Sequence, residues 1–183
     1  NFAAILASSG KRVLLIDADM RKGYAHDYLG LKREAGLSEL ISTSMTVEQV
    51  IKKTALENMD FISTGVIPPN PAELLEKAVA GNLFVNLSKN YDLLIIDTPP
   101  VLAVSDTQIL ASSIETLFLI AYADVTTVAE VVESRKLIEQ SGGAVTGVVF
   151  NGFNMNKKRY GYGGYQRYQY HYMDYKYNVP RGK

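Results

Sequence analysis

The stretch Val13-Leu14-Leu15-Ile16-Asp17-Ala18-Asp19-Met20-Arg21 decides how this chain folds. Its four consecutive apolar residues stop at an aspartate, and such short runs are typical of a parallel strand that is buried on both faces. A second stretch, Leu93-Leu94-Ile95-Ile96-Asp97, has the same form. Both aspartates are therefore expected at the carboxyl ends of strands, where ligands bind in open sheets of this kind.

Predicted helices alternate with further strands along the chain. Weaker strands are predicted at 59–62, 116–121 and 144–150, and helices at 1–9, 72–79 and 128–141. Pro71 is suited to the first turn of a helix. The segments Ser105-x-x-Gln108 and Thr127-x-x-Glu130 match capping boxes, which mark helix starts. This alternation predicts an α/β fold with a mostly parallel sheet flanked by helices.

The composition excludes several kinds of site. A chain of 183 residues with 47% hydrophobic residues is long and apolar enough for one α/β domain. The absence of cysteine rules out disulfides, thiolate metal ligands and cysteine nucleophiles. Two histidines, His26 and His171, are too few for a histidine-based metal site. The longest apolar run is far short of the roughly 18–20 residues that span a bilayer, and no signal-peptide pattern occurs.

The character of the sequence changes at Asn156. Residues 156–183 show no apolar periodicity and are predicted to form a disordered tail beside a folded domain over residues 1–155. The tail carries a net charge of +6 and the rest of the chain −6, which favours docking on a carboxylate-rich site; a solvated terminus is the alternative. It holds eight of the twelve tyrosines: Tyr160, Tyr162, Tyr165, Tyr168, Tyr170, Tyr172, Tyr175 and Tyr177.

Three aspartates are the candidate chemical groups. Asp17 and Asp19, at the end of a predicted strand, are suited to hold a hydrated Mg²⁺ or to accept a proton, because Mg²⁺ needs only one or two carboxylates. Arg21 is suited to neutralise phosphate charge. Asp97 ends four apolar residues in the Walker B pattern, whose carboxylate holds Mg²⁺ opposite nucleotide phosphates. Turn chemistry is the alternative for the Asp-x-Asp pattern, but the two motifs together favour a magnesium–nucleotide site.

A phosphate-binding loop of the Gly-x-x-x-x-Gly-Lys-Ser/Thr type does not occur in the chain. Residues 1–7 look like the remainder of the helix that follows such a loop. We therefore expect the loop and its strand to precede Asn1, and we expect the 183 residues on their own to bind ATP poorly.

The chain resembles the bacterial tyrosine kinases (BY-kinases) of the polysaccharide co-polymerase type. The resemblance rests on the segments 14–24, 65–75 and 92–106 and on the tyrosine cluster. That family has a P-loop NTPase fold related to the MinD and ParA ATPases, with Walker A, Walker A′ and Walker B elements. The resemblance implies an ATP- and Mg²⁺-dependent autokinase that phosphorylates its tyrosine tail in trans and regulates capsular or exopolysaccharide synthesis and export. Because the Walker A lysine is missing, we expect negligible kinase activity from residues 1–183 on their own.

The resemblance assigns roles to individual residues. Asp17 and Asp19 match the Walker A′ carboxylates and Asp97 the Walker B one; Asp17 is expected to be the base toward the incoming hydroxyl, and Asp19 and Asp97 to order the magnesium shell. Tyr24 matches a tyrosine that relatives phosphorylate to relieve inhibition, and a packed loop aromatic is the alternative. Asn151 lies where related ATPases place an asparagine against adenine, and a turn residue is the alternative.

The resemblance also implies partners and a location. It implies a homo-oligomeric ring in which each tail reaches the neighbouring active site, an upstream membrane-anchored segment, a cognate tyrosine phosphatase, the polysaccharide export machinery, and a position at the cytoplasmic face of the bacterial inner membrane. No nucleic acid is expected as a partner. Two alternatives remain open: a MinD/ParA-like ATPase switch without kinase activity, which would typically end in an amphipathic helix or a DNA-binding surface, and a nucleotide-dependent scaffold without catalysis.

Overall fold

The computed structural model describes residues 1–153. The predicted tail, its eight tyrosines and the domain boundary expected after residue 155 lie outside the described residues. The strands are β1 (Val13–Asp17), β2 (Lys52–Lys53), β3 (Met59–Ile62), β4 (Leu93–Asp97), β5 (Leu117–Tyr122) and β6 (Val145–Asn151). The helices are α1 (Phe2–Ser8), α2 (Ala25–Leu29), α3 (Leu37–Ser42), α4 (Val47–Val50), α5 (Pro71–Ala80), α6 (Leu83–Ser88), α7 (Asp106–Ala111) and α8 (Val128–Gln140).

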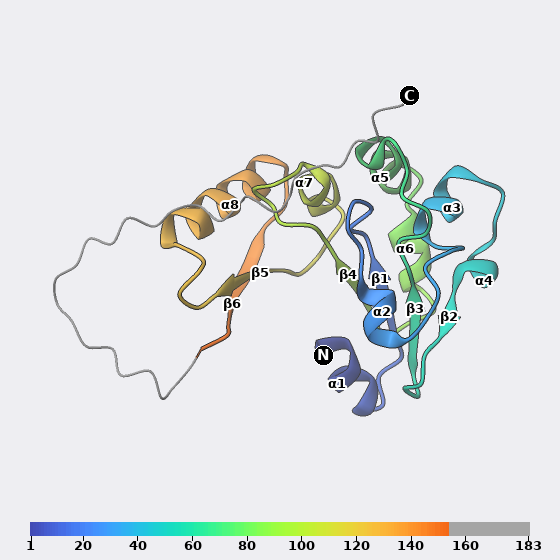
Figure 1. Ribbon diagram of the computed structural model, residues 1–183. Coiled ribbons are helices and arrows are strands. Elements are labelled where there is room, and N and C mark those ends of the chain that lie inside the picture. Colours follow the sequence, from blue (N-terminus) through green and yellow to red (C-terminus); the bar gives the residue numbers. More distant parts are fainter. Residues whose placement is uncertain (154–183) are drawn as a thin grey trace, which may run out of the picture.

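The strands of this part of the chain form two sheets (Figure 1). The first has the order β2-β3-β1-β4, with β1 parallel to both β3 and β4 and the short β2 antiparallel at the edge. The second consists of the parallel pair β5-β6. The predicted α/β fold with a mostly parallel sheet is confirmed. The break between β4 and β5 was not predicted, because local periodicity says nothing about which strands pair.

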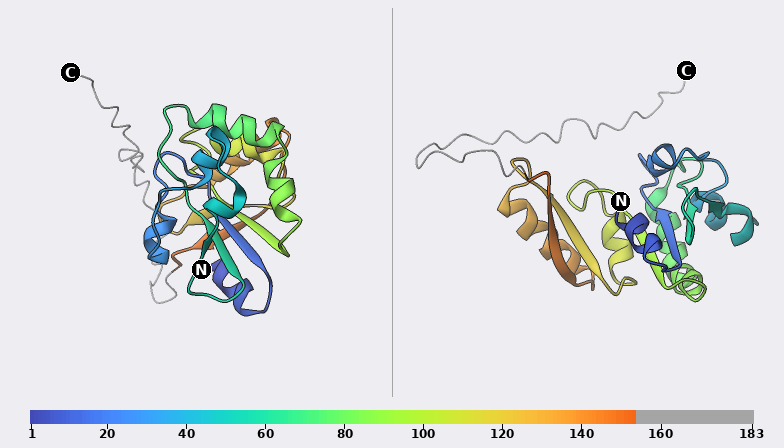
Figure 2. Two further views of the ribbon diagram at one scale, coloured as in Figure 1. Left: turned by 90° about the vertical axis from the view of Figure 1, so that its right-hand side faces the viewer. Right: turned by 90° about the horizontal axis from the view of Figure 1, so that it is seen from below.

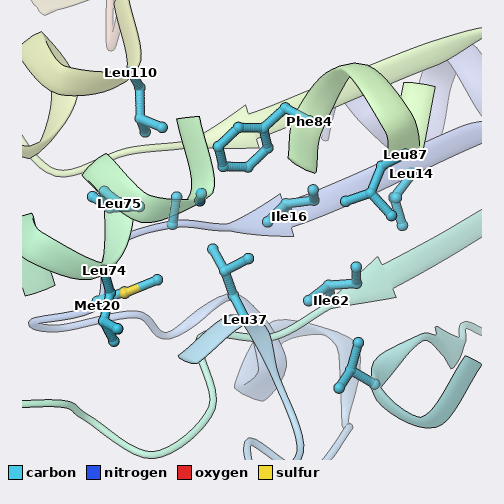
Figure 3. Close-up of a cluster of buried hydrophobic side chains, with 13 residues drawn as sticks. Leu14, Ile16, Met20, Leu37, Ile62, Leu74, Leu75, Phe84, Leu87 and Leu110 are labelled. Carbon is cyan, nitrogen blue, oxygen red and sulfur yellow. The ribbon is translucent and has the colours of Figure 1, made fainter. Parts of the chain in front are cut away.

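The main core lies between the first sheet and the helices α3, α5, α6 and α7 (Figure 3). Full burial of one such aliphatic or aromatic side chain stabilises the fold by roughly 1.5–3 kcal/mol. Met20, which lies in the loop after β1, is fully buried in this core. The buried Met20 side chain therefore fixes the loop that carries Asp19 and Arg21 to the core. The labelled members of the core are Leu14, Ile16, Met20, Leu37, Ile62, Leu74, Leu75, Phe84, Leu87 and Leu110.

Helix α8 and the β5–β6 pair form a unit beside the first sheet (Figure 2). Leu117 and Leu119 on one face of β5 pack with Ile138 of α8, whereas Phe118 and Ile120 on the other face are exposed. The capping box predicted at Thr127 is confirmed, because Thr127 Oγ1 accepts a hydrogen bond from the backbone N–H of Glu130 at 3.2 Å, and the Glu130 carboxylate accepts one from the Thr127 N–H.

The capping box predicted at Ser105 is wrong. Helix α7 begins beside it, at Asp106, but Ser105 has helical backbone angles and its side chain makes no capping hydrogen bond. A capping residue needs an extended backbone so that its side chain can reach back to the first turn. Helix α8 begins at Val128 as predicted, and α1 and α5 begin at Phe2 and Pro71, each one residue from the predicted start. None of the helices described in residues 1–153 is long and apolar enough to cross a membrane.

Candidate active site

Strands β1 and β4 end side by side, and this places two of the predicted aspartates next to each other. Asp17 and Asp97 are register partners at the carboxyl ends of the two strands. The chain after β1 continues along β4, since the N–H of Ala18 donates to the Asp97 carbonyl oxygen at 2.8 Å. Both aspartates therefore lie at the carboxyl ends of strands, as predicted, and the pairing of β1 with β4 brings them together.

Asp17 is fully buried at this edge. Burial raises its pKa to about 6, and the nearby charge of Asp97 acts in the same direction. Two backbone N–H groups oppose this effect by donating to the carboxylate, from Ala25 at 3.1 Å and from Asp19 at 3.2 Å. A carboxylate with a pKa near 6 is ionised at neutral pH and still basic enough to accept a proton.

Asp19 and Asp97 complete the acidic group. Asp19 is half-buried, and its Oδ1 accepts backbone N–H bonds from Arg21 at 3.0 Å and Lys22 at 2.9 Å. Asp97 has an exposed side chain, yet the protein atoms crowded around it desolvate its carboxylate and, with the charge of Asp19, raise its pKa. These carboxylates repel one another, and a divalent cation relieves such repulsion.

The acidic group fits Mg²⁺ in the presence of a nucleotide, and not a metal held by protein alone. Among the residues that the structure describes, no three His, Cys, Asp or Glu side chains are arranged to hold a metal ion. Mg²⁺ does not need such a set, because it keeps several waters and binds one or two carboxylates together with substrate phosphates. Asp19 and Asp97 are the two carboxylates nearest to solvent at this edge.

A short segment after the Asp-x-Asp motif covers Asp17. Gly23 is buried, and a Cβ atom there would collide with Thr64 Oγ1 and lie 2.6 Å from Asp17 Oδ2. Only glycine therefore allows the chain to pass this close to the carboxylate. Tyr24 lies between Gly23 and Ala25, and its own side chain is exposed. The predicted alternative of a packed aromatic does not describe Tyr24 in this structure.

Arg21 forms an ion pair that the sequence did not predict. Its Nε and Nη2 atoms donate to Oδ2 and Oδ1 of Asp106, both at 2.9 Å, and Asp106 is fully buried at the start of α7. Next to it, Thr107 Oγ1 donates to the carbonyl oxygen of Pro99 at 2.7 Å. An aspartate in the first turn of a helix signals a helix start and nothing about its partner, so the sequence contained no sign of this contact.

Asn151 lies apart from the three aspartates in the topology, at the end of β6 in the second sheet. Its Oδ1 accepts a hydrogen bond from the backbone N–H of Gly152 at 2.9 Å. This contact is the turn chemistry expected of an asparagine at a strand end. The contact with adenine remains a prediction.

The mostly parallel sheet and the acidic ends of β1 and β4 are features of the class of α/β proteins with the P-loop NTPase fold. A family model described as "AAA domain" matches residues 1–139. The chain is 41% identical over 173 residues to the tyrosine-protein kinase wzc of Salmonella typhi, covering 94% of this chain and 24% of that protein. It is 39% identical over 150 residues to the tyrosine-protein kinase etk of Escherichia coli K12, covering 82% of this chain and 21% of that protein.

Solved structures agree with this relationship. The kinase domain of the Escherichia coli tyrosine kinase ETK matches with a TM-score of 0.82 and 37% identity, over 92% of this chain and 65% of that chain. The MinD cell division ATPase of Pyrococcus furiosus matches with a TM-score of 0.68 and 20% identity over 81% of this chain and 62% of that chain, which shows a shared fold. The chain belongs to the AAA-domain family, in the group of the bacterial tyrosine-protein kinases. It spans about a quarter of the length of the curated relatives that it matches.

Proposed function

We propose that this chain is the larger part of a kinase domain that transfers the γ-phosphoryl group of ATP to protein tyrosine. The observation that carries the proposal is the acidic group of Asp17, Asp19 and Asp97 at two adjacent strand ends, in a chain 41% identical to a tyrosine-protein kinase. In the transfer, the tyrosine oxygen bonds to the γ-phosphorus, the bond from that phosphorus to the bridging oxygen breaks, and ADP leaves.

Each aspartate has a part in this proposal. Asp19 and Asp97 hold Mg²⁺, partly through water, and the bound ion neutralises phosphate charge. Asp17 accepts the proton of the tyrosine hydroxyl, whose ordinary pKa is about 10. The pKa of Asp17, raised to about 6 by burial, suits a base at neutral pH. We assign Asn151 to adenine on the strength of the family resemblance alone.

Access to Asp17 is a further part of the proposal. The segment from Gly23 to Ala25 covers the carboxylate, so an incoming hydroxyl reaches Asp17 only after this segment moves. Tyr24 is exposed within the segment. A phosphate on Tyr24 adds about −1.5 to −2 charges beside an already acidic edge. We propose that this repulsion uncovers Asp17 and relieves inhibition.

The phosphate-binding loop has a natural place in the fold. In the described residues β4 pairs with β1 and β5 pairs with β6, so each of β4 and β5 has one edge without a hydrogen-bonded strand. We propose that a strand carrying a Walker A loop, from a part of the protein outside these 183 residues, pairs into the break between β4 and β5. On this proposal residues 1–183 alone have negligible kinase activity.

The tyrosine-rich tail is the proposed substrate. Its eight tyrosines and net charge of +6 favour docking at the acidic edge of a neighbouring copy, and several added phosphates reverse that charge. We further propose that the full-length protein assembles as a ring at the cytoplasmic face of the inner membrane, with a tyrosine phosphatase and the polysaccharide export machinery as partners.

Incubation of the full-length protein with ATP labelled at the γ-phosphate separates a kinase from a MinD-like ATPase switch. The proposal predicts Mg²⁺-dependent label on tyrosine. Release of labelled phosphate without any phosphotyrosine would support the ATPase switch and contradict the kinase proposal. The kinase is favoured because identity to the kinase domain of ETK is 37%, against 20% to MinD.

A further inference from the structure

Helix α7 begins with two adjacent residues that contact both loops of the acidic edge. Asp106 forms the bidentate ion pair with Arg21, in the loop after β1. Thr107 donates its hydroxyl hydrogen to the carbonyl oxygen of Pro99, in the loop after β4. One helix start is thus bonded to the loop that carries Asp19 and to the loop that follows Asp97.

Both contacts are of a kind that fixes geometry. Asp106 is fully buried and Thr107 is 3% exposed, so neither side chain has water as a substitute partner. A buried carboxylate is strongly unfavourable without a partner, and the planar guanidinium of Arg21 satisfies both oxygens in one orientation. The helix itself is held in place because Leu110 and Ala111 are fully buried in the two cores that flank it.

The ion pair is connected to Asp19 through a single residue. The guanidinium of Arg21 bonds to Asp106, and the backbone N–H of Arg21 donates to Asp19 Oδ1 at 3.0 Å. A shift of Asp106 therefore moves the donor that orients the Asp19 carboxylate. On the other side, Pro99 follows Asp97 by two residues, so the Thr107 hydrogen bond restrains the chain directly after Asp97.

We propose that Asp106 and Thr107 are positioning residues that set the separation of the Asp19 and Asp97 carboxylates, and with it the Mg²⁺ affinity of the site. Arg21 then acts as a link between Asp106 and Asp19, in place of the phosphate contact expected from the sequence. The inference rests on the proposed function only in that Asp19 and Asp97 hold the magnesium of a nucleotide complex.

The test measures binding, not catalysis. A fluorescent ADP analogue is titrated into the full-length protein, and the Mg²⁺ concentration for half-maximal binding is read from the anisotropy. Asp106→Asn raises that concentration at least tenfold, the usual size of losses at residues that orient metal ligands. Thr107→Val raises it about fivefold, as expected for one lost hydrogen bond, and Asp106→Glu restores part of the loss.

A matched control exists at the other end of the same strands. Arg12 pairs with Asp92 at 3.0 Å and so joins the amino ends of β1 and β4, in an exposed position. Asp92→Asn removes an arginine–aspartate pair far from the carboxyl ends of these strands and leaves the Mg²⁺ requirement of nucleotide binding unchanged. Circular dichroism establishes which variants fold. If Asp106→Asn does not fold, the Mg²⁺ requirement of Thr107→Val tests the positioning role.

The double variant Arg21→Gln/Asp106→Asn distinguishes a link from a phosphate ligand. If Arg21 acts through Asp106, the double variant binds no worse than Asp106→Asn, because the two side chains form one unit. A further loss of nucleotide affinity in the double variant would overturn the inference, and so would an unchanged Mg²⁺ requirement in a folded Asp106→Asn or Thr107→Val. Wild-type protein that binds Mg²⁺-nucleotide but makes no phosphotyrosine contradicts the kinase proposal and leaves this inference standing.

Discussion

The two ends of the β1–β4 strand pair have opposite charge patterns. At the amino ends, Arg12 bonds to Asp92 through its backbone N–H at 2.8 Å and its guanidinium at 3.0 Å, and the hydrogen bond from the guanidinium lowers the pKa of Asp92. At the carboxyl ends, Asp17 lies beside Asp97, and burial and like charge raise the pKa of Asp17 to about 6. The charged side chains at the amino ends of the two strands attract each other, whereas those at the carboxyl ends repel each other.

The difference in charge pattern indicates that the amino and carboxyl ends of the strand pair have different roles. An exposed ion pair contributes little to stability but is at least compatible with it. Like charges collected at a strand end are unfavourable until a cation neutralises them, so stability does not account for their presence. Functional sites often keep such unfavourable arrangements. The carboxyl ends of β1 and β4 are therefore the edge of the sheet at which we place the proposed active site, and we call it the working edge.

The largest predicted effect comes from Asp17→Asn at the working edge. If Asp17 accepts the tyrosine proton, tyrosine phosphorylation by the full-length protein falls by about 10²–10⁴-fold, the usual contribution of a general base. The rate of label transfer to tyrosine measures this. The control is Asp92→Asn at the amino ends, which keeps its activity. An Asp17→Asn variant as active as wild type would show that Asp17 is not the base that accepts the tyrosine proton.

A second prediction concerns the proposed substrate of the working edge. Replacement of all eight tail tyrosines by phenylalanine removes nearly all phosphate incorporation, because the modifiable hydroxyls are lost while the charge of the tail is kept. Autoradiography of the full-length variant after incubation with labelled ATP measures this. Undiminished labelling would show that the acidic edge acts on other residues.

Two glycines, one on either side of β1, are predicted to respond differently to replacement by alanine. Gly23→Ala forces a Cβ against Asp17 and Thr64, so we expect an activity loss of about tenfold or more together with lower stability. Gly10, before the amino end of β1, has a φ of 88° but nothing within 4 Å of an added Cβ. Gly10→Ala therefore costs roughly 1–2 kcal/mol of stability, because alanine is strained at a positive φ, and leaves activity intact. Thermal unfolding measures the change in stability, and label transfer to tyrosine measures the change in activity. Equal activity losses in the two variants would contradict the claim that the segment at Gly23 covers Asp17.

The fourth and smallest effect is a dependence of stability on pH. The pKa of Asp17 is raised in the folded protein to about 6 from an ordinary value of 3.8. Its stabilising contribution is therefore present below about pH 4 and is lost as the pH rises through 6, since the folded state binds the proton more tightly. Without Mg²⁺, the free energy of unfolding of wild type relative to Asp17→Asn falls by about 2 kcal/mol over this range. Denaturant unfolding at pH 4 and pH 7 measures it, and a constant difference would contradict the raised pKa.

Much of the fold was predictable because its signals are local. The apolar runs that end at Asp17 and Asp97 are strands β1 and β4, and residues 59–62 form β3 as predicted. The capping box at Thr127 was recognisable from two residues three positions apart. These elements are determined by residues close together in the sequence, and the periodicity of apolar residues detects such local patterns. The Ser105 prediction failed because the same local pattern occurs with a helical backbone at the cap position.

The arrangement around the acidic group was only partly predictable. Asp17 and Asp97 were each expected at the carboxyl end of a parallel strand, where ligands bind in open sheets. The pair of Arg21 with Asp106 joins residues 85 positions apart, and an isolated arginine and aspartate carry no sign of each other. The need for glycine at position 23 likewise depends on Thr64, which reaches the site from the end of a different strand. Such contacts depend on the assembled fold.

Phosphotyrosine formation is measured as a function of Mg²⁺ concentration in full-length wild type and in Asp97→Asn, to test whether the acidic strand ends carry out phosphoryl transfer. We expect label on tyrosine that rises with Mg²⁺ in wild type and is lost in Asp97→Asn at all Mg²⁺ concentrations, with both proteins folded. Labelling of Asp97→Asn at the wild-type level and with the wild-type Mg²⁺ dependence would contradict the claim that the carboxyl ends of β1 and β4 are the site of phosphoryl transfer.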